Sequence, residues 1–328
     1  MIGLRYLSRD GGLAAGAGDW QAAVADIRKV VALLADGHAG MEPESVMPMG
    51  VDPRNKAYGL PAWLRGDYDA AGLKWAVHRA EADVELPSIL SATFVNRLSD
   101  GRPLGVVESA LLTRMRTGAV SALAIETLLP RSPSTVTVLG AGAQAAAHVD
   151  MLRALFPSVA EIRLWNRSRA RRDALIDMLA GGRGAPVRPF ERLEDAVEGA
   201  EAVLTCTSSP EPLLGAWAVR PGRLIVQVGY HEVDFEAIDS SDHVVVDLWG
   251  EFAERSAKSL FQMYRAGRFA PQRVAADLAG LLVNGWRPPA GASLYFSSFG
   301  LNLFDIALAA RVLRRADRDD IGTRLAFL

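Results

Sequence analysis

Residues 134–148 read STVTVLGAGAQAAAH: an apolar, β-branched run meets a glycine turn, and an alanine-rich run follows at once. This order predicts a strand, a tight turn and a helix. Gly140 can adopt a backbone conformation that a side chain would forbid, and Gly142 leaves room for a ligand to approach the main chain. The free N–H groups of the helix that begins near Ala143 then favour an anion, helped by the helix dipole.

The glycine turn reads GAGAQA, a variant of the dinucleotide-binding fingerprint in which Ala145 stands at the third glycine. Alanine there still permits close packing of the helix on the strand. The bare motif is a weak signal, but the strand before it and the helix after it provide the required context. We therefore predict that the pyrophosphate of a dinucleotide binds here, the alternative being a turn without a ligand. The residues of this predicted site are Gly140, Ala141, Gly142, Ala143 and Gln144.

After this turn the sequence continues to alternate between strand and helix patterns. The candidate strands are residues 135–139, 161–165, 202–206, 224–228 and 244–247, and helices fill most of the gaps. Such alternation is the signature of an α/β fold, so we predict a Rossmann-type, doubly wound parallel sheet.

The first part of the chain has a different pattern, typical of an α+β unit with largely antiparallel pairing. A turn signal at residues 99–102 joins two candidate strands, 89–96 and 104–108. Residues 40–72 are rich in proline, glycine and methionine, which predicts a loop with short strands. Before this loop, Asp19 is placed to cap a helix with apolar residues at helical spacing.

The chain has 328 residues, too many for one small core, so we expect two domains. We predict a dinucleotide-binding domain over residues 116–292. The other domain combines residues 1–115 with residues 293–328, because the last stretch ends in a helix that can return to the first part of the chain. A long helix over residues 111–129 would bridge the two domains.

The composition excludes several classes of protein. The 36 basic and 38 acidic residues give a net charge of −2, and no basic stripe indicates a nucleic-acid partner. Cys206 is the only cysteine, which excludes an intrachain disulfide and suits a reducing compartment. Arg5 and Arg9 interrupt the N-terminal region, so we expect no signal peptide, and no apolar run reaches the roughly 20 residues that span a bilayer. The histidine spacing predicts no metal site. We expect a cytoplasmic protein.

The tip of the second strand of the predicted sheet indicates which dinucleotide is bound. Residues 164–169 read LWNRSR, without the carboxylate that normally binds the ribose hydroxyls of NAD. Guanidinium groups suit a 2′-phosphate, which favours NADP(H) over NAD(H), although a merely solvated helix start would leave the preference open. The residues predicted to contact the ribose or nicotinamide parts are Asn166, Arg167, Ser168, Arg169, Thr205, Thr207, Ser208 and Val228.

Several stretches together resemble the ornithine cyclodeaminase/μ-crystallin family. The strongest is MRTGAVSALA over residues 115–124, which stands just before the glycine turn, as in the family. The stretches VLGAGAQA, WNR, LTCTSS and FGLNLFDIA match in the family's order, so the resemblance covers nearly the whole chain. It implies a substrate and dimerisation domain, completed by the C-terminal segment, around a nicotinamide-binding domain, and hence a homodimer.

The resemblance also implies roles for individual residues. Arg116 matches the arginine that holds the substrate carboxylate, a task that suits a planar guanidinium fork. Lys74 matches the substrate-site lysine, which we predict to be both catalytic and substrate-binding. Lys56 falls where the family often has a second carboxylate-binding arginine, and this is a departure. Phe299 and Gly300 fall in the segment that closes over the substrate.

A second departure concerns the catalytic aspartate of the cyclodeaminases, which follows the glycine after the strand that matches residues 224–228. This sequence has Tyr230 and His231 there, so we predict His231 or Glu232 as the acid or base instead. A related branch that forms 2,3-diaminopropionate also departs at this position. The present chain shares its VVVD-x-W element over residues 244–249.

These observations lead to a principal hypothesis and two alternatives. The first is an NAD(P)-dependent oxidoreductase that acts on the C–N bond of a small α-amino or α-imino acid, as an amino acid dehydrogenase or an imine reductase. The missing aspartate and the NADP-favouring strand tip support it. The alternatives are an ornithine or lysine cyclodeaminase, which is an ammonia-releasing lyase that recycles its NAD, and a μ-crystallin-like protein that binds NADPH or another ligand without catalysis.

Overall fold

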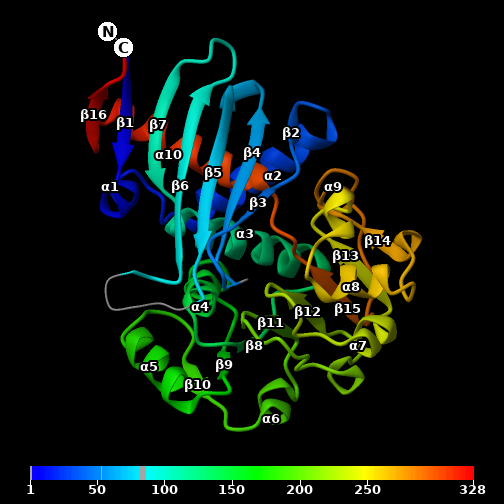
Figure 1. The fold of residues 1–328 in the computed structure, drawn as a ribbon. Coiled ribbons are helices and arrows are strands. Elements are labelled where there is room, and N and C mark those ends of the chain that lie inside the picture. Colours follow the sequence, from blue (N-terminus) through cyan, green and yellow to red (C-terminus); the bar gives the residue numbers. More distant parts are fainter. Residues whose placement is uncertain (1, 53, 81–85) are drawn as a thin grey trace. The chain divides into compact units, whose positions relative to one another are not determined.

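The computed structural model describes residues 2–52, 54–80 and 86–328 and divides the chain into two units (Figure 1). Unit 1 comprises Met1–Arg116 with Gly300–Leu328, and unit 2 comprises Thr117–Phe299. One boundary therefore falls inside helix α3 (Ala110–Leu128). Among the described residues, no helix combines the length and the apolar character that crossing a membrane requires.

Unit 1 is built on a mixed sheet. Its strands are β1 (Gly3–Leu7), β2 (Ala39–Met41), β3 (Ser45–Pro48), β4 (Lys56–Leu64), β5 (Ala70–His78), β6 (Ile89–Arg97), β7 (Pro103–Glu108) and β16 (Thr323–Ala326). They run in the order β16-β1-β7-β6-β5-β4-β2, with β3 paired on β4. The pairs are antiparallel except for β1 with β7, as the hairpin signal at residues 99–102 predicted for β6 and β7.

Helices of unit 1 cover one face of this sheet. They are α1 (Arg9–Ala14), α2 (Trp20–Ala35), the 3-10 turn η1 (Gly66–Tyr68) and α10 (Asn302–Arg318). The Asp19 side chain accepts a hydrogen bond from the Ala22 N–H and caps α2, as the sequence predicted. Helix α10 is almost entirely buried over its first three turns and packs against β4 and β5, which places its residues at the centre of unit 1.

The prediction of a loop over residues 40–72 was wrong for β4. This nine-residue strand pairs along its whole length with β5, from Lys56 opposite His78 to Leu64 opposite Ala70. Pro61 obscured it, because proline lacks an N–H and is usually confined to strand edges. Here Pro61 falls between the residues that pair with β2 and those that pair with β3, where the outer ladder is interrupted.

Unit 2 contains the predicted parallel sheet. Its strands are β8 (Thr135–Leu139), β9 (Glu161–Trp165), β10 (Val187–Pro189), β11 (Ala202–Thr205), β12 (Leu224–Gln227), β13 (His243–Val246), β14 (Val274–Ala276) and β15 (Leu294–Ser297). The order is β10-β9-β8-β11-β12-β15-β13-β14, and each ladder is parallel. The chain proceeds from β8 toward one edge and from β11 toward the other, so the switch point of a doubly wound sheet lies between these two strands. The predicted fold class is confirmed.

Short helices connect these strands. They are α4 (Ala143–Leu155), α5 (Arg169–Leu179), α6 (Leu193–Val197), α7 (Phe235–Ser240), α8 (Ser259–Arg265) and α9 (Leu278–Leu282), with 3-10 turns η2 (Ala216–Ala218), η3 (Glu251–Glu254) and η4 (Pro271–Arg273).

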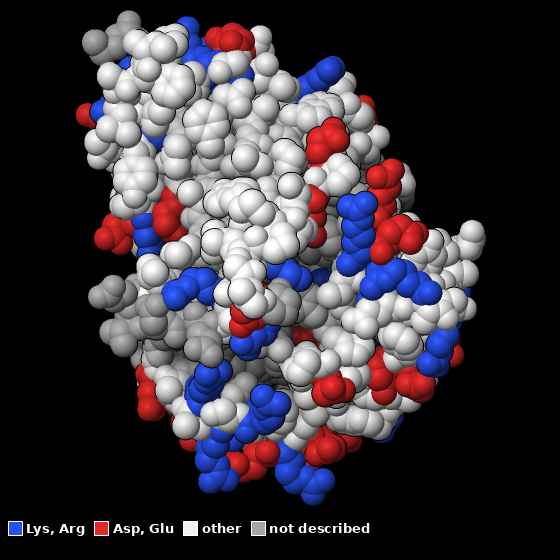
Figure 2. Space-filling view, viewed as in Figure 1, with Lys and Arg blue, Asp and Glu red and all other residues white. Residues whose placement is uncertain are grey.

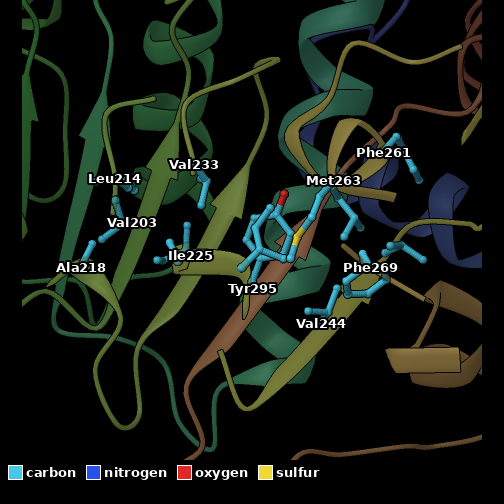
Figure 3. Packing of buried hydrophobic residues seen from close by; sticks show 14 of the residues in the cluster. Val203, Leu214, Ala218, Ile225, Val233, Val244, Phe261, Met263, Phe269 and Tyr295 are labelled. Atoms are coloured by element: carbon cyan, nitrogen blue, oxygen red, sulfur yellow. The ribbon is translucent and has the colours of Figure 1, made fainter. Parts of the chain in front are cut away.

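The position of β15 differs from the predicted domain boundary at residue 293. This strand lies between β12 and β13 in the sheet of unit 2, and the chain enters unit 1 only at Gly300. Its four residues are buried, as expected for a strand covered on both faces of a parallel sheet. Tyr295 packs among Ile225, Val244 and Met263 in the core of unit 2 (Figure 3).

Candidate active site

The glycine turn lies at the switch point of the unit 2 sheet. Gly140 has a φ of +121°, and a Cβ there would lie 2.4 Å from the carbonyl oxygen of Cys206, just after β11. Only glycine fits both the backbone conformation and this close approach. The turn after β8 therefore lies directly against the end of β11, where doubly wound sheets bind their ligands.

Gly142 and the start of α4 form the accessible part of the glycine turn. Gly142 is the N-cap of the 13-residue helix, supplies no capping side chain, and would have nothing within 4 Å of an added Cβ. The first N–H groups of α4 and the exposed backbone of Ala143 are thus accessible to an anion. Ala141 and Gln144 flank this backbone, and Gln144 Oε1 is buried without a hydrogen-bond partner among the described residues. The backbone at Gly142 and Ala143 fits the pyrophosphate of a dinucleotide, whereas the Gln144 oxygen, an acceptor, does not contribute to binding it.

A buried histidine fixes the first turn of α4. His148 Nδ1 lies 2.7 Å from the Gln144 carbonyl oxygen, and Nε2 lies 2.9 Å from the Ser121 hydroxyl of α3. Burial lowers the pKa of His148 to about 4, so the imidazole is neutral at pH 7. Nδ1–H donates to the carbonyl, and Nε2 accepts from Ser121. No motif in the sequence marks His148 for this role.

The tip of β9 carries the residues predicted to choose between NAD and NADP. Asn166 Nδ2 donates to the Ser168 carbonyl at 2.9 Å, and Ser168 caps α5. Arg169 pairs with Glu191 at 2.5 Å, whereas the exposed Arg167 guanidinium pairs with no carboxylate among the described residues. Glu191, which lies outside the LWNRSR motif, thus places a carboxylate near the tip of β9. It pairs with Arg169, one of the two arginines predicted to bind a 2′-phosphate. The cofactor preference stays a prediction.

Glu232 lies at the ends of β11 and β12, where it contacts Thr207 and Gln227. Its side chain is fully buried, and Oε1 accepts from the Thr207 N–H at 3.0 Å and the Thr207 hydroxyl at 3.1 Å. Gln227 Nε2 approaches Oε2 at 3.3 Å. Burial raises the pKa of Glu232, although nearby Lys258 opposes this shift. Glu232 therefore holds Thr207 in place, and its predicted role as an acid or base stays a prediction.

Two other predicted residues, Val228 and His231, lie beside Glu232, and the neighbouring residues Lys258 and Ser259 hold them. Lys258 Nζ donates to the carbonyl oxygens of Val228 at 2.5 Å and Gly229 at 2.7 Å. His231 Nδ1 lies 3.2 Å from the Ser259 hydroxyl and is only half-buried.

The remaining predicted residues near the end of β11 differ in exposure. Thr205 Oγ1 is buried without a partner among the described residues, and Ser208 is exposed. Farther along this edge, Tyr230 follows Gly229 and is exposed, and Asp234 caps α7 by accepting from the Ala237 N–H. The aspartate available in this loop is therefore engaged in capping.

Unit 1 contains a second cluster, built on one buried carboxylate. Lys74 of β5 donates to Asp305 of α10 at 2.9 Å, and both side chains are almost completely buried. Arg116 of α3 places Nε 3.6 Å from the other oxygen of Asp305. The structure thus brings together the two residues that the family resemblance singled out, and adds an acid between them.

The electrostatics of this cluster act mainly on Lys74. Burial lowers the pKa of Lys74, Asp305 opposes the shift, and the neighbouring charge of Arg116 adds to it. Glu44 is close enough to interact with Lys74 electrostatically, and burial raises the pKa of Glu44. A lysine in this setting can give up its proton more readily than one in water.

Arg116 contacts Asp305 without a hydrogen bond and packs on the backbone of Gly300. Its Nε is buried and has no hydrogen-bond partner within the described part of the chain. Gly300 has a φ of +94°, and a Cβ at this position would lie 2.2 Å from Arg116 Nη1. The backbone at Gly300 therefore packs directly against the guanidinium, so this predicted residue does belong to the cluster.

The two other predicted substrate residues lie apart from the cluster or at its side. Phe299 belongs to unit 2, where it stacks on Phe252 with ring centroids 3.8 Å apart. Lys56 is half-buried on the same face of the unit 1 sheet as Lys74, opposite His78. Phe299 is thus part of an aromatic cluster in unit 2. The Lys56 side chain lies on the sheet face that α10 covers, the face that also carries Lys74.

Sequence reasoning missed Asp305 and Glu191. Asp305 lies within the FGLNLFDIA stretch that carries the resemblance, and two cations in one buried site require an acid. That requirement is the signal that could have found Asp305. Glu191 lies on a loop far from the β9 tip in sequence, and no motif marks it.

The family model described as "Ornithine cyclodeaminase/mu-crystallin family" matches residues 18–319. The chain belongs to this family. The resemblance predicted from the motifs is therefore confirmed, including the branch of dehydrogenases.

Among named relatives of this family, ketimine reductase mu-crystallin of Rattus norvegicus is 30% identical over 77% of this chain and 78% of its own. N-((2S)-2-amino-2-carboxyethyl)-L-glutamate dehydrogenase of Staphylococcus aureus is 24% identical over 84% of each chain. The structure of Thermococcus litoralis Δ(1)-pyrroline-2-carboxylate reductase in complex with NADH and L-proline has the same fold, with a TM-score of 0.89 and 21% identity over 98% of this chain and 99% of that one. These names agree with the predicted class of enzyme.

Proposed function

We propose that the chain is an NAD(P)-dependent oxidoreductase that acts on the C–N bond of a small α-amino or α-imino acid. The observation that carries this proposal is the unit 1 cluster, in which Lys74 and Arg116 meet at one buried carboxylate, the lysine through a hydrogen bond and the guanidinium through a longer ion pair at Nε. The glycine turn of unit 2, open to a pyrophosphate, supports the choice of cofactor.

Arg116 has the properties of a carboxylate-binding residue. Asp305 lies 3.6 Å from Nε and Gly300 packs on Nη1, so the guanidinium is held in one orientation before substrate binds. A planar fork in fixed orientation binds a carboxylate through two parallel N–H···O bonds. Binding the α-carboxylate in this way would orient the neighbouring C–N bond.

Lys74 has the properties of a proton donor and acceptor. When bound, the nicotinamide ring would deliver hydride to the imine carbon or accept hydride from the amine carbon. In the direction of reduction, Lys74 Nζ would donate the proton that the imine nitrogen gains, and in oxidation Nζ would accept it. Its lowered pKa suits this exchange, and Asp305 stabilises the charged form between turnovers.

Net redox chemistry, rather than cyclodeamination, is supported by the loop after β12. The residue that follows Gly229 is an exposed tyrosine, and Asp234 is engaged as the cap of α7. Glu232 is completely buried and accepts hydrogen bonds from Thr207, which suits a positioning residue better than a group that meets substrate. Neither Tyr230 nor Asp234 thus offers the carboxylate that the cyclodeaminases have after this glycine, while the half-buried His231 keeps its predicted role as an acid or base.

The test is a panel of α-imino and α-amino acids assayed with NADPH, NADH and their oxidised forms. We expect a stoichiometric change in the absorbance of the reduced cofactor with at least one substrate. Ammonia release from ornithine with catalytic cofactor, and without net absorbance change, would instead identify a cyclodeaminase. Cofactor binding without turnover of any amino or imino acid would favour the non-catalytic alternative.

We also propose that the protein is a cytoplasmic homodimer and that the exposed face of the unit 1 sheet forms the interface. The strand registers place six exposed apolar side chains on the face opposite α10, and Figure 2 shows few charged residues over β4–β7. These side chains are Tyr6, Leu73, Trp75, Leu90, Phe94 and Leu325. A contiguous apolar surface of this kind is typical of a subunit interface. The buried, unpaired Cys206 supports the reducing location.

A further inference from the structure

The chain between β2 and β3 forms a bulge at the edge of the unit 1 sheet. Met41 ends β2 opposite Ala62, and Ser45 begins β3 opposite Gly59. Three residues of the edge therefore face only two residues of β4, and an excess of one residue on one strand defines a β-bulge. Bulges redirect side chains, and the last residue of this one is Glu44.

The alternation of the strands places Glu44 beside the lysine of the proposed site. Leu60, which faces the bulge, pairs with Lys74 on the next strand. Val46 pairs with Tyr58, which lies two residues before Leu60 on β4 and so points to the same face. Glu44 precedes Val46 by two residues, so the alternation puts it on the face that carries Lys74. The electrostatic interaction between Glu44 and Lys74 agrees with this placement.

A contact with α10 holds the bulge next to the buried cluster. The Asn302 side chain donates to the Glu42 carbonyl at 3.4 Å, and Asn302 is the first residue of α10. Asp305, which binds Lys74 at 2.9 Å, stands three residues later on the same helix. The bulge and the proposed substrate cluster are therefore fixed to the same end of one buried helix within unit 1.

Glu44 has no partner among the described residues that accounts for its position. It is half-buried, its oxygens keep contact with solvent, and its carboxylate forms no hydrogen bond or ion pair with the described part of the chain. Lys74 already has a hydrogen-bonded counter-charge in Asp305. Burial raises the pKa of Glu44, as expected for a carboxylate that loses water without gaining a donor. A cationic ligand that reaches Glu44 would supply this donor.

We propose that Glu44 binds a positively charged group on the side chain of the substrate, which makes a basic α-amino or α-imino acid the preferred substrate. This inference rests on the proposed function, in which Arg116 holds the α-carboxylate and Lys74 meets the C–N bond. The rest of the substrate extends from the α-carbon, and Glu44 is the half-buried acid beside Lys74 that can meet it. An ammonium or guanidinium group would form a charge-assisted hydrogen bond with this carboxylate. Tyr58, on the same sheet face, offers an aromatic ring that suits a cation.

The test is calorimetric titration of the full chain, saturated with oxidised cofactor, with basic amino acids and their uncharged isosteres. L-2,4-diaminobutyrate, L-ornithine and L-lysine differ in length, and L-norvaline, L-norleucine and L-2-aminoheptanoate replace the respective ammonium group by methyl. We expect at least one basic amino acid to bind about 10–100-fold more tightly than its isostere. Glu44→Gln should abolish this difference. Glu42→Gln, the matched control at an exposed position of the same bulge, should keep it.

Equal affinity of the unmodified chain for each basic amino acid and its isostere would overturn the proposal. An equal loss for both members of a pair in Glu44→Gln would also overturn it, because Glu44 would then act through Lys74 and not on the ligand. The absorbance of the reduced cofactor separates this inference from the proposed function. A preference for basic ligands without any net change in absorbance contradicts only the redox function. Redox turnover of basic and neutral acids with equal kcat/KM contradicts only the role of Glu44.

Discussion

The two units each bury a carboxylate beside a lysine, yet the two carboxylates differ in which groups they bind. In unit 2, Glu232 accepts hydrogen bonds from Thr207, and Lys258 donates to backbone carbonyls at the end of β12. In unit 1, Lys74 and Arg116 both depend on Asp305, and Arg116 Nε has no hydrogen-bond partner among the described residues. A carboxylate filled by hydrogen bonds from one loop fixes that loop, whereas a carboxylate shared by two cations holds them in place for a ligand.

The largest difference between the two clusters should appear when each carboxylate becomes an amide. Asp305→Asn leaves Lys74 and Arg116 buried without their counter-charge, so we expect a loss of about 3–5 kcal/mol in the free energy of unfolding, together with loss of activity. Glu232→Gln keeps an acceptor for Thr207, and we expect a loss of only about 1 kcal/mol. Urea denaturation of both variants measures the difference. Equal losses would contradict the contrast drawn between the two clusters.

The two lysines offer the next comparison. Lys74→Met removes the proposed proton donor, and we expect kcat to fall by roughly 10²–10⁴-fold while the chain stays folded. Lys258→Met removes a backbone-binding cation, so we expect lower stability without a comparable fall in kcat. Steady-state kinetics and thermal denaturation separate the two effects. If both variants lose kcat equally, Lys74 has no special chemical role.

Arg116 can be tested against a neighbour on the same helix. Arg116→Met removes a charged fork, and we expect kcat/KM for carboxylated substrates to fall by about 10–100-fold, mainly through KM, with unchanged cofactor affinity. Arg114→Met is the control, since Arg114 is half-buried on α3 but has no place in the cluster. Unchanged kinetics in Arg116→Met would remove this residue from the substrate site.

The smallest expected effect concerns His148 and follows from its pKa. The unfolded chain takes up a proton near the ordinary pKa of 6.5, whereas the folded chain does so only near 4. Because the unfolded state binds more protons in this window, stability falls as the pH is lowered, by roughly 2 kcal/mol between about pH 6.5 and pH 5. His148→Gln should lack this dependence, as denaturation at several pH values would show. A variant with the same pH profile as the unmodified chain would exclude His148 as the cause.

Local patterns in the sequence predicted the features that depend on neighbouring residues. The glycine turn at Gly140, the Asp19 cap and the β6–β7 hairpin each arise within a few positions, so composition and spacing were sufficient. Strand β16 escaped prediction because its side chains are exposed and show no apolar alternation. It forms only by pairing with β1 from the other end of the chain.

The candidate site shows the same limit. Lys74 and Arg116 could be named because specific motifs carry them, but their common partner, Asp305, lies 231 positions from Lys74. In the same way, Glu191 reaches the β9 tip from a loop that no motif marks. Partners brought together only by the tertiary fold leave no periodic signal, so the sequence identified the cations and missed the acids.

The close packing of Gly300 on Arg116 means that a substitution at Gly300 would alter the proposed substrate site. A single methyl group at this position would need the space that the Arg116 guanidinium now fills, and the backbone there already favours glycine. Replacement of Gly300 by alanine would therefore displace the arginine without altering its chemistry. The carboxylate binding proposed for Arg116 would then be weakened by a single codon change that encodes no charged or catalytic side chain.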